Sequence, residues 1–429
     1  MIARPNAIVY ICDSCLTKAR TLRIPRIRTR SGARCRRTEP HRGYATSEKT
    51  KDTKDLENYW INRQPPLEEP TEAGLLPLGQ RRRLIELSGP DTPKFLQGLI
   101  TNNVDASQRD PYYAAFLDAR GRVLWDVFVW PTQLDGWGCF IEIDAKEVDD
   151  VLRHLKRHKL RSKVAINASP AKEVWAAWGE EDYLRHSLKI LPDYIPDPRA
   201  PGFGYRFLQE PVDGQIDNEN LAMWKASDLL MSLAEYDLRR YLFGIAEGQS
   251  EIERGVALPM DYNIDLSSGI DFRKGCYVGQ ELTIRTKHTG VVRKRVLPVQ
   301  LYSSISSSTS TDEAPAFDRT IREQVHRDIS GTNIRQVDDK GKPKRGTPAG
   351  KLLARIDNVG LALCRLENMT PMRVSAEGGT YIPGAQFKIF EGTDGEPLET
   401  PVGVRAYVPP WLREREKALW DKGRQRKLT

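Results

Sequence analysis

Apolar residues in this chain occur in short runs separated by turn residues, and this pattern constrains the fold more than any other feature. Four early runs have the length of strands: 82–87, 113–117, 123–130 and 137–143. Residues 118–121 form a glycine-containing hairpin turn between the second and third runs, and from residue 145 the apolar spacing becomes helical. No run approaches the roughly 18 apolar residues of a transmembrane helix. The first half is therefore predicted to be an α+β region that does not insert into a membrane.

The second half has a different pattern. Further strands are predicted at 291–301, 350–354, 359–366 and 386–390, and their Gly and Pro turns favour a small β-barrel. A serine-rich opening and polar composition predict a disordered insertion at 303–348. The last residues are basic and contain two tryptophans, which favours a short helix on the surface or against the barrel.

These patterns divide the chain into predicted segments: a transit peptide at 1–44, a linker at 45–73, an α+β region at 74–290, a barrel at 291–408 with its insertion at 303–348, and a basic tail at 409–429. The linker is polar and contains prolines. At 429 residues the chain is long enough to bury a substantial core.

Positive charge is concentrated at the N-terminus. Residues 1–44 contain eleven Lys/Arg and two acids, whereas the rest has 55 basic and 56 acidic residues, so the net charge of +8 arises in the first segment. An Arg-rich, acid-poor start is typical of a mitochondrial transit peptide, and the residues from Arg42 resemble a matrix-protease site with cleavage after Tyr44. A basic arm that binds acidic partners is the alternative. The nearly neutral remainder gives no reason to expect nucleic acid as a partner.

Cysteine use is typical of a reducing compartment. Three of the six cysteines lie in the predicted transit peptide and would be removed with it: Cys12, Cys15 and Cys35. The remaining Cys139, Cys276 and Cys364 are odd in number and widely spaced, which argues against a disulfide framework. Cys139 and Cys364 lie in apolar strands and are predicted to be core residues.

The segment KGCYVGQE at 274–281 places Cys276 between two glycines. Gly275 and Gly279 permit a tight backbone path with positive φ. The residues after Gly279 begin a predicted helix whose N-terminus would lie near the thiol, and Lys274 adds a positive charge. Both features favour the thiolate, the reactive form of cysteine. From these residues alone, a buried and unreactive Cys276 in a glycine turn remains an open alternative.

Other side chains near this segment have the chemistry to contact a ligand. Tyr277 offers a stacking face or a phenolic hydrogen bond. Downstream, Arg285, Lys287 and His288 gather positive charge that suits a carboxylate or a polyglutamate tail.

The pattern Lys-Gly-Cys-Tyr-x-Gly-Gln-Glu, with Arg285 soon after it, resembles the signature of the folate-binding iron–sulfur cluster assembly factors, a family related to the glycine-cleavage T-protein. Other segments are similar to that family: FLQG…TN at 95–102, GRVL at 121–124 with Asp126, and LPMDYN at 258–263. The resemblance covers most of 76–300 and, weakly, 349–408. It implies an α+β fold of aminomethyltransferase-like, folate-binding domains around a central opening, followed by a small C-terminal β-barrel.

The resemblance also implies a function. The chain would help to mature [4Fe–4S] proteins of the mitochondrial matrix, both aconitase-type and lipoate- or radical-SAM-type clients, together with A-type scaffold proteins. Cys276 would be the functional thiol, supported by Lys274. Tetrahydrofolate is the implied cofactor, and the residues assigned to it are Asn102, Arg122, Asp126, Tyr277, Gln280, Glu281 and Arg285.

Two alternatives concern the chemistry. A tetrahydrofolate-dependent aminomethyltransferase would resemble the T-proteins, which carry adjacent acids on the strand after the glycine turn. Here that pair is Trp125-Asp126, so a conventional enzyme is not expected; if enzymatic, the chain would be a one-carbon transferase. A stable cluster normally needs four thiolate or imidazole ligands, more than the three cysteines left after cleavage. Cys276 is therefore a ligand shared with a partner's transient cluster or a reactive thiol, and both possibilities stay open.

Overall fold

The computed structural model describes residues 70–132, 136–169, 172–186, 194–209, 230–303, 314–318, 327–372 and 380–421. The predicted transit peptide, residues 1–44, lies outside the described residues, as do all but the last four residues of the predicted linker. Within the part described, no helix combines the length and apolar character needed to cross a bilayer.

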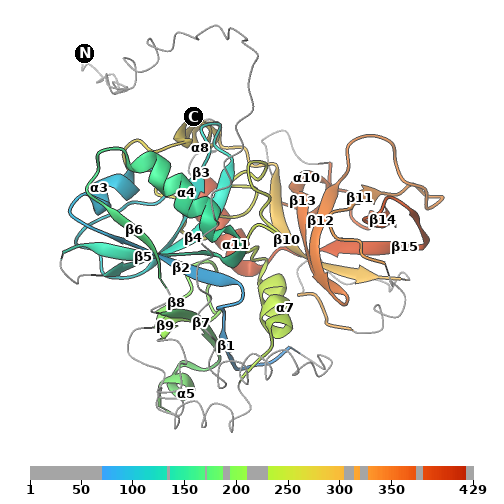
Figure 1. Cartoon of the computed structure of the whole chain (residues 1–429). Coiled ribbons are helices and arrows are strands. Elements are labelled where there is room, and N and C mark those ends of the chain that lie inside the picture. The colour runs from blue at the N-terminus through green and yellow to red at the C-terminus, as the bar shows by residue number, and fades with distance from the viewer. Residues whose placement is uncertain are drawn as a thin grey trace, which may run out of the picture. The chain divides into compact units, whose positions relative to one another are not determined.

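An antiparallel five-stranded sheet, in the order β3–β4–β5–β2–β6, forms the first half (Figure 1). Its strands are β2 (Arg82–Ser88), β3 (Tyr112–Leu117), β4 (Val123–Thr132), β5 (Gly138–Asp144) and β6 (Ala165–Ser169). The predicted hairpin is confirmed, because β3 pairs with β4 around a turn in which Gly121 has a φ of +80°. Helix α4 (Val148–Lys159), preceded by the 3-10 turn η1 (Ala145–Glu147), buries Val151 and Leu155 in the cluster on one face of this sheet.

A smaller sheet has the order β1–β7–β9–β8. Its strands are β1 (Gly74–Pro77), β7 (Glu173–Trp178), β8 (Ile195–Pro196) and β9 (Tyr205–Gln209). The helices of this half are α3 (Thr92–Gln97), α5 (Glu181–His186), α7 (Leu233–Phe243) and α8 (Gln280–Thr289). A capping box of Ser232 and Glu235 begins α7, and Gly244, in the left-handed conformation, ends it.

The C-terminal part is a closed barrel in the order β10–β13–β12–β11–β14–β15. Its strands are β10 (Lys294–Tyr302), β11 (Asn333–Gln336), β12 (Gly350–Ile356), β13 (Val359–Arg365), β14 (Phe387–Glu391) and β15 (Pro397–Ala406), with α10 (Leu366–Met369) after β13. The predicted disordered insertion at 303–348 is wrong for β11, which pairs with both β12 and β14 and so closes the barrel. Residues 304–313 and 319–326 lie outside the described residues.

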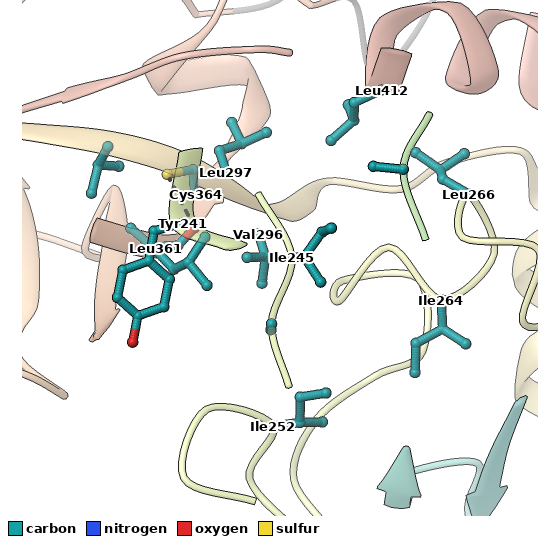
Figure 2. Packing of buried hydrophobic residues seen from close by; sticks show 14 of the residues in the cluster. Tyr241, Ile245, Ile252, Ile264, Leu266, Val296, Leu297, Leu361, Cys364 and Leu412 are labelled. Carbon is teal, nitrogen blue, oxygen red and sulfur yellow. Dashed lines mark hydrogen bonds between the residues drawn. The ribbon is translucent and has the colours of Figure 1, made fainter. Parts of the chain in front are cut away.

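One hydrophobic core joins the barrel to the α+β region. Figure 2 shows barrel residues Val296, Leu297, Leu361 and Cys364 together with Ile245, Ile252, Ile264, Leu266 and Leu412. Each of these side chains is almost completely buried, and full burial of an aliphatic side chain contributes roughly 1.5–3 kcal/mol. The segment 245–266, which leads toward Cys276, is therefore fixed against the barrel before it reaches the candidate site.

Candidate functional site

Cys276 lies in a segment without regular secondary structure, residues 273–279, that runs directly into α8 and is called the signature loop below. The thiol is exposed. The other two described cysteines are buried in strands, Cys139 in β5 and Cys364 in β13, which confirms their predicted core positions. Burial raises the pKa of both buried thiols, so they stay protonated. Among the described cysteines, Cys276 is therefore the one that another molecule can reach.

Lys274 ties the signature loop to the end of α3. Its ammonium donates to three backbone carbonyls, those of Gln97 (2.9 Å), Ile100 (2.8 Å) and Asn102 (2.6 Å). The amide of Val278 donates to the carbonyl of Gly98 at 3.1 Å and adds a fourth bond to the same segment. Burial lowers the pKa of Lys274 to about 8, and Asp271 opposes the shift. The Lys274 side chain thus fastens the signature loop to the backbone of residues 97–102.

Two glycines in contact fix the other end of the loop. Gly279 has a φ of +80°, and a Cβ at this position would lie 2.3 Å from the carbonyl oxygen of Asp118. A Cβ at Gly121, in the turn between β3 and β4, would lie 2.9 Å from the carbonyl oxygen of Gly279 and 2.8 Å from Leu282. The hairpin turn can approach the start of α8 this closely only because both positions lack a side chain. Three separate sequence segments, at 95–102, 121–124 and 274–281, therefore meet around Cys276.

The four predicted residues from Tyr277 to Arg285 differ in their exposure to solvent. Tyr277 is buried, its ring centroid lies 5.0 Å from the Lys274 ammonium, and burial raises its pKa to about 12. The side-chain oxygen of Gln280 accepts from the Tyr277 amide at 3.3 Å, which supports the turn into the helix. Glu281 and Arg285 are exposed on the helix surface. Only these last two face solvent as a ligand-binding residue must.

Asn102 and Arg122 make structural contacts with backbone. The Asn102 amide donates to the carbonyls of Tyr113 and Ser268, both at 2.8 Å, and so joins β3 to the segment before the signature loop. Arg122 donates to the carbonyl of Val256 at 2.7 Å. These bonds position the loop and its neighbours.

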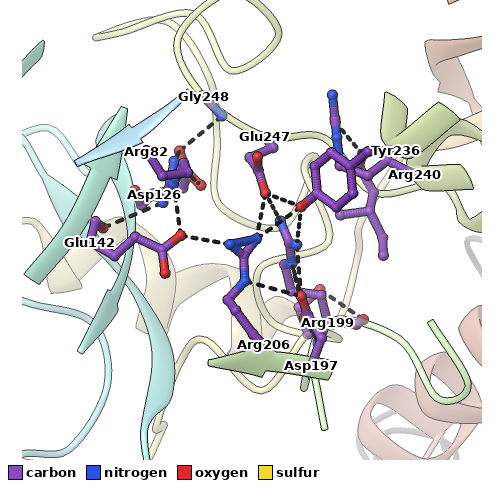
Figure 3. A network of polar contacts seen from close by, with 12 residues as sticks. Arg82, Asp126, Glu142, Asp197, Arg199, Arg206, Tyr236, Arg240, Glu247 and Gly248 are labelled. Carbon is purple, nitrogen blue, oxygen red and sulfur yellow. Dashed lines mark hydrogen bonds and ion pairs between the residues drawn. The ribbon is translucent and has the colours of Figure 1, made fainter. Parts of the chain in front are cut away.

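Asp126 belongs to a different site, a buried charge network shown in Figure 3. Its members come from β2, β4, β5, β9, α7 and the segments 197–199 and 247–251: Arg82, Arg199, Arg206, Arg240, Asp126, Glu142, Asp197, Asp237, Glu247, Glu251 and Tyr236. All of them are more than nine-tenths buried. Sequence reasoning missed this network, although charged residues at core-facing positions of apolar strands, such as Arg82 and Glu142, are a usable signal.

Most charged groups of the network are paired. Asp126 accepts from Arg82 at 3.2 Å and from the backbone amide of Gly248 at 3.1 Å. Arg206 joins Glu142 to Glu247, with both distances 2.7 Å. Burial alone would lower the pKa of Arg82, but Asp126 and Glu142 outweigh it and raise that pKa. Asp126 is completely buried and neutralised, so the structure does not bear out its predicted place on the lining of an opening.

A cavity of about 650 Å³ borders the network. Its lining includes the charged residues Arg81, Arg82, Lys146, Glu247 and Glu251, together with Ser330 and Leu353 from the barrel part of the chain. None of the seven residues assigned to folate lines it. The cavity and the surroundings of Cys276 are therefore distinct sets of residues.

Comparison with known proteins gives a consistent result. The family model described as "CAF17, C-terminal beta-barrel domain" matches residues 293–413. A protein named "Iron-sulfur cluster assembly factor IBA57 homolog, mitochondrial" from Phaeosphaeria nodorum is 45% identical over 372 residues, which cover 83% of this chain and 84% of that protein. A protein with the same name from Coccidioides immitis is 42% identical over 411 residues, or 90% and 92% of the two chains.

A solved structure supports the same fold. The glycine cleavage system aminomethyltransferase T from Bartonella henselae aligns with 80% of this chain and 88% of its own, with a TM-score of 0.55 and 13% sequence identity. At that identity the likeness concerns the fold alone. The predicted α+β architecture, aminomethyltransferase-like and followed by a C-terminal barrel, is confirmed.

Proposed function

The chain belongs to the family of mitochondrial iron–sulfur cluster assembly factors that includes the IBA57 homologues, and we propose that it performs this role through the thiol of Cys276. Identities of 42–45% over more than four-fifths of both chains support the assignment. The function is cluster assembly in the mitochondrion, and the matrix is its compartment. The buried charge network, the cavity and the signature loop are different sets of residues, so each needs a role of its own.

The access and support of Cys276 carry this proposal. The thiol is exposed, while four hydrogen bonds and a glycine contact hold the loop on either side of it. A thiol presented on a tethered loop can reach a metal cluster held by a second protein without a large ordering cost. The buried Cys139 and Cys364 cannot do so.

The cluster is treated as cargo. Within the described residues, no three His, Cys, Asp or Glu side chains are grouped in a way that could hold a metal ion. A cluster bound through Cys276 therefore takes its other ligands from a partner. We propose an A-type scaffold protein as that partner, with [4Fe–4S] proteins of the aconitase, lipoate-synthase and radical-SAM types as clients.

The experiment compares the wild type with Cys276→Ser, and with Cys364→Ala as a control that removes an inaccessible thiol. Each protein is mixed with an A-type scaffold carrying its cluster, and visible absorption and circular dichroism are recorded. If Cys276 is a shared cluster ligand, mixing with the scaffold should change the spectra of the wild type and of Cys364→Ala. The spectra of the mixture with Cys276→Ser should not change. Unchanged spectra with lost aconitase maturation in cells would indicate a reactive thiol. Full maturation by Cys276→Ser would overturn the role of Cys276.

The transferase alternative gains no support from the site. Asp126, the acid that remains on β4, is completely buried and bonded to Arg82 and the Gly248 amide, so a ligand cannot reach its carboxylate without displacing these partners. Trp125 points to the other face of the sheet, where its indole donates to Glu147 at 2.8 Å. Turnover of an aminomethyl-lipoyl carrier by the wild type would contradict this conclusion.

Tetrahydrofolate remains a separate proposal. None of the seven residues assigned to it lines the 650 Å³ cavity; Asn102, Arg122 and Gln280 bond backbone, and Asp126 lies in the buried network. We propose this cavity as the folate site, because Arg81 and Lys146 offer positive charge to the carboxylates. Five carboxylates share the lining and Arg81 also pairs with Asp237, so the positive charge open to a ligand is small. Titration calorimetry with tetrahydrofolate should show saturable binding that Arg81→Ala weakens. If the wild type binds no tetrahydrofolate, folate is not a ligand of this protein.

A further inference from the structure

The C-terminal residues form a strap that leaves the barrel and returns to the α+β region. The strap consists of α11 (Pro410–Glu416) and the π-helical turn η2 (Lys417–Asp421). The sequence favours a helix on the surface or against the barrel for this segment. The helix is confirmed, and both tryptophans of the strap are buried, with Trp420 1% exposed.

Three anchors attach the strap to the α+β region. The indole of Trp411 donates to the carbonyl of Phe243 at the end of α7, at 3.2 Å. Arg415 donates to the carbonyls of Leu266 (2.7 Å) and Pro198 (2.9 Å). The indole of Trp420 donates to Asp265 at 3.0 Å. The last two anchors lie at 265–266, in the segment that leads into the signature loop.

Lys287 connects the strap to α8. Its ammonium donates to the carbonyl of Leu419 at 2.6 Å and lies 4.6 Å from the ring centroid of Trp420. It also lies 4.9 Å from the ring centroid of Phe272, the residue directly before the signature loop. A cation between two aromatic faces is attracted by both rings. Lys287 therefore joins the beginning of the loop, the far end of α8 and the strap at one point.

Helix α8 buries little of its own surface. Of its ten residues only Thr283 is buried, and a helix of this length is not stable on its own. A cavity of about 210 Å³ lies beneath it, lined by Leu282, Thr283, Thr286 and residues of the segments 258–261 and 291–294. The glycine contact fixes the N-terminal end, so the position of the helix depends on the tether at Lys287.

We propose that Lys287 and Trp420 are positioning residues for Cys276, and that the strap fastens α8 and both ends of the signature loop in the geometry that meets the cluster-bearing partner. The inference rests on the proposed role of Cys276. It assigns the strap a part in presenting the thiol, in addition to its part in the hydrophobic core.

The test uses the full-length protein and four variants: Lys287→Met, Lys287→Arg, Trp420→Ala and Trp420→Phe. Lys351→Met, which removes a partly exposed ammonium 3.8 Å from Glu253, is the matched control. Hydrogen exchange of residues 272–289 and the rate at which iodoacetamide alkylates Cys276 are measured first. Cluster transfer from the scaffold is measured second.

Lys287→Met and Trp420→Ala should speed exchange in residues 272–289 by about tenfold, because a cation–π contact and a hydrogen bond are lost there. The alkylation rate should change severalfold, and transfer should slow. Lys287→Arg and Trp420→Phe should restore most of the wild-type behaviour, and Lys351→Met should match the wild type. Unchanged exchange at 272–289, or an equal rise throughout the barrel, would overturn the inference. If Cys276→Ser transfers clusters normally while exchange responds as expected, the proposed function fails and the strap's hold on the loop stands.

Discussion

At the residue scale, the position of the Cys276 thiol depends on two glycines that differ in their constraints. Gly279 has a positive φ and no room for a Cβ, whereas Gly275, beside the cysteine, has open space around its Cα and no positive φ. The signature therefore contains one glycine that the fold requires and one that it tolerates. The same substitution at Gly279 and at Gly275 can therefore be compared directly.

Gly279→Ala should destabilise the protein by at least about 2 kcal/mol, because the left-handed backbone and the clash with Asp118 both oppose a side chain. Gly275→Ala should change stability by less than about 0.5 kcal/mol. Urea unfolding followed by circular dichroism measures both. Equal effects of the two substitutions would show that the contact between Gly279 and Gly121 does not hold the loop.

The network should be sensitive to the loss of one partner. Arg82→Met leaves Asp126 buried without its counter-ion, and we expect a loss of about 3–5 kcal/mol. Arg120→Met removes the exposed pair with Asp118 and should cost less than about 1 kcal/mol. If Arg82→Met is as mild as the control, Asp126 is not held as a buried ion. Replacing Asp126 by Leu in the Arg82→Met background should recover part of the loss.

Sequence reasoning predicted the local structure around Cys276 but not the environment of its neighbours. The pattern predicted the helix start, since Gln280 begins α8. The partners of Lys274 could not be predicted, because its carbonyl acceptors come from residues about 170 positions earlier and no local pattern reveals such pairing. Asp126 was misplaced for the same reason: its partners Arg82 and Gly248 are far away in sequence.

At the element scale, helix α4 packs on one face of the five-stranded sheet and places a histidine, His154, in the contact. His154 is half-buried, and its ring centroid lies 5.1 Å from that of Trp125 on β4 and 4.3 Å from that of His158. Burial, together with the nearby His158 and Arg157, lowers the pKa of His154 to about 4. The helix therefore packs on the sheet with this ring neutral.

This pKa predicts a pH dependence of stability. Between about pH 6.5 and 4 the unfolded chain binds a proton at His154 that the folded chain does not, so the stability from this group is lost as the pH falls. The loss should be about 1–2 kcal/mol, below the full shift because the ring is partly exposed. Unfolding of wild type and His154→Phe should differ in slope over this range and run parallel near pH 7.5. Identical slopes below pH 6 would contradict the assignment.

Seven of the fifteen described strands escaped prediction, β1, β6–β9, β11 and β15, and two of them, β1 and β11, are only four residues long. In β1, Gly74 and Pro77 occupy the ends, and β11 lies in a polar context that favours disorder. Both strands are set by their neighbours: β1 pairs with β7, about 100 residues later, and β11 is held between β12 and β14. The other eight strands, β2–β5, β10 and β12–β14, overlap the predicted runs, and those predicted positions agree with the structure.

At the scale of the whole molecule, Asp265 joins the three parts of the described chain. It accepts from Arg295 on β10 at 2.9 and 3.0 Å and from Trp420 of the strap, while lying in the segment that leads to the signature loop. Arg295 is completely buried. This carboxylate therefore couples the barrel, the strap and the α+β region.

Asp265→Ala should destabilise the protein by about 3–5 kcal/mol, because it leaves the Arg295 charge buried without its partner. It should also separate the unfolding of the barrel from that of the α+β region, which differential scanning calorimetry would detect as a second transition. Arg327→Ala, which breaks an exposed pair with Asp394, serves as the control and should stay within about 1 kcal/mol. A single unshifted transition for Asp265→Ala would rule out this coupling.

The strap is also the last part of the described chain to be synthesised. A gene that carries a premature stop codon just after the barrel would still encode the whole Lys274–Glu281 segment and every barrel strand. Its product would nevertheless lack Trp420 and the carbonyl that binds Lys287, so Cys276 would sit at the end of an unfastened helix. Such a truncation should therefore be judged as a loss of function, even though each recognisable motif of the family is intact.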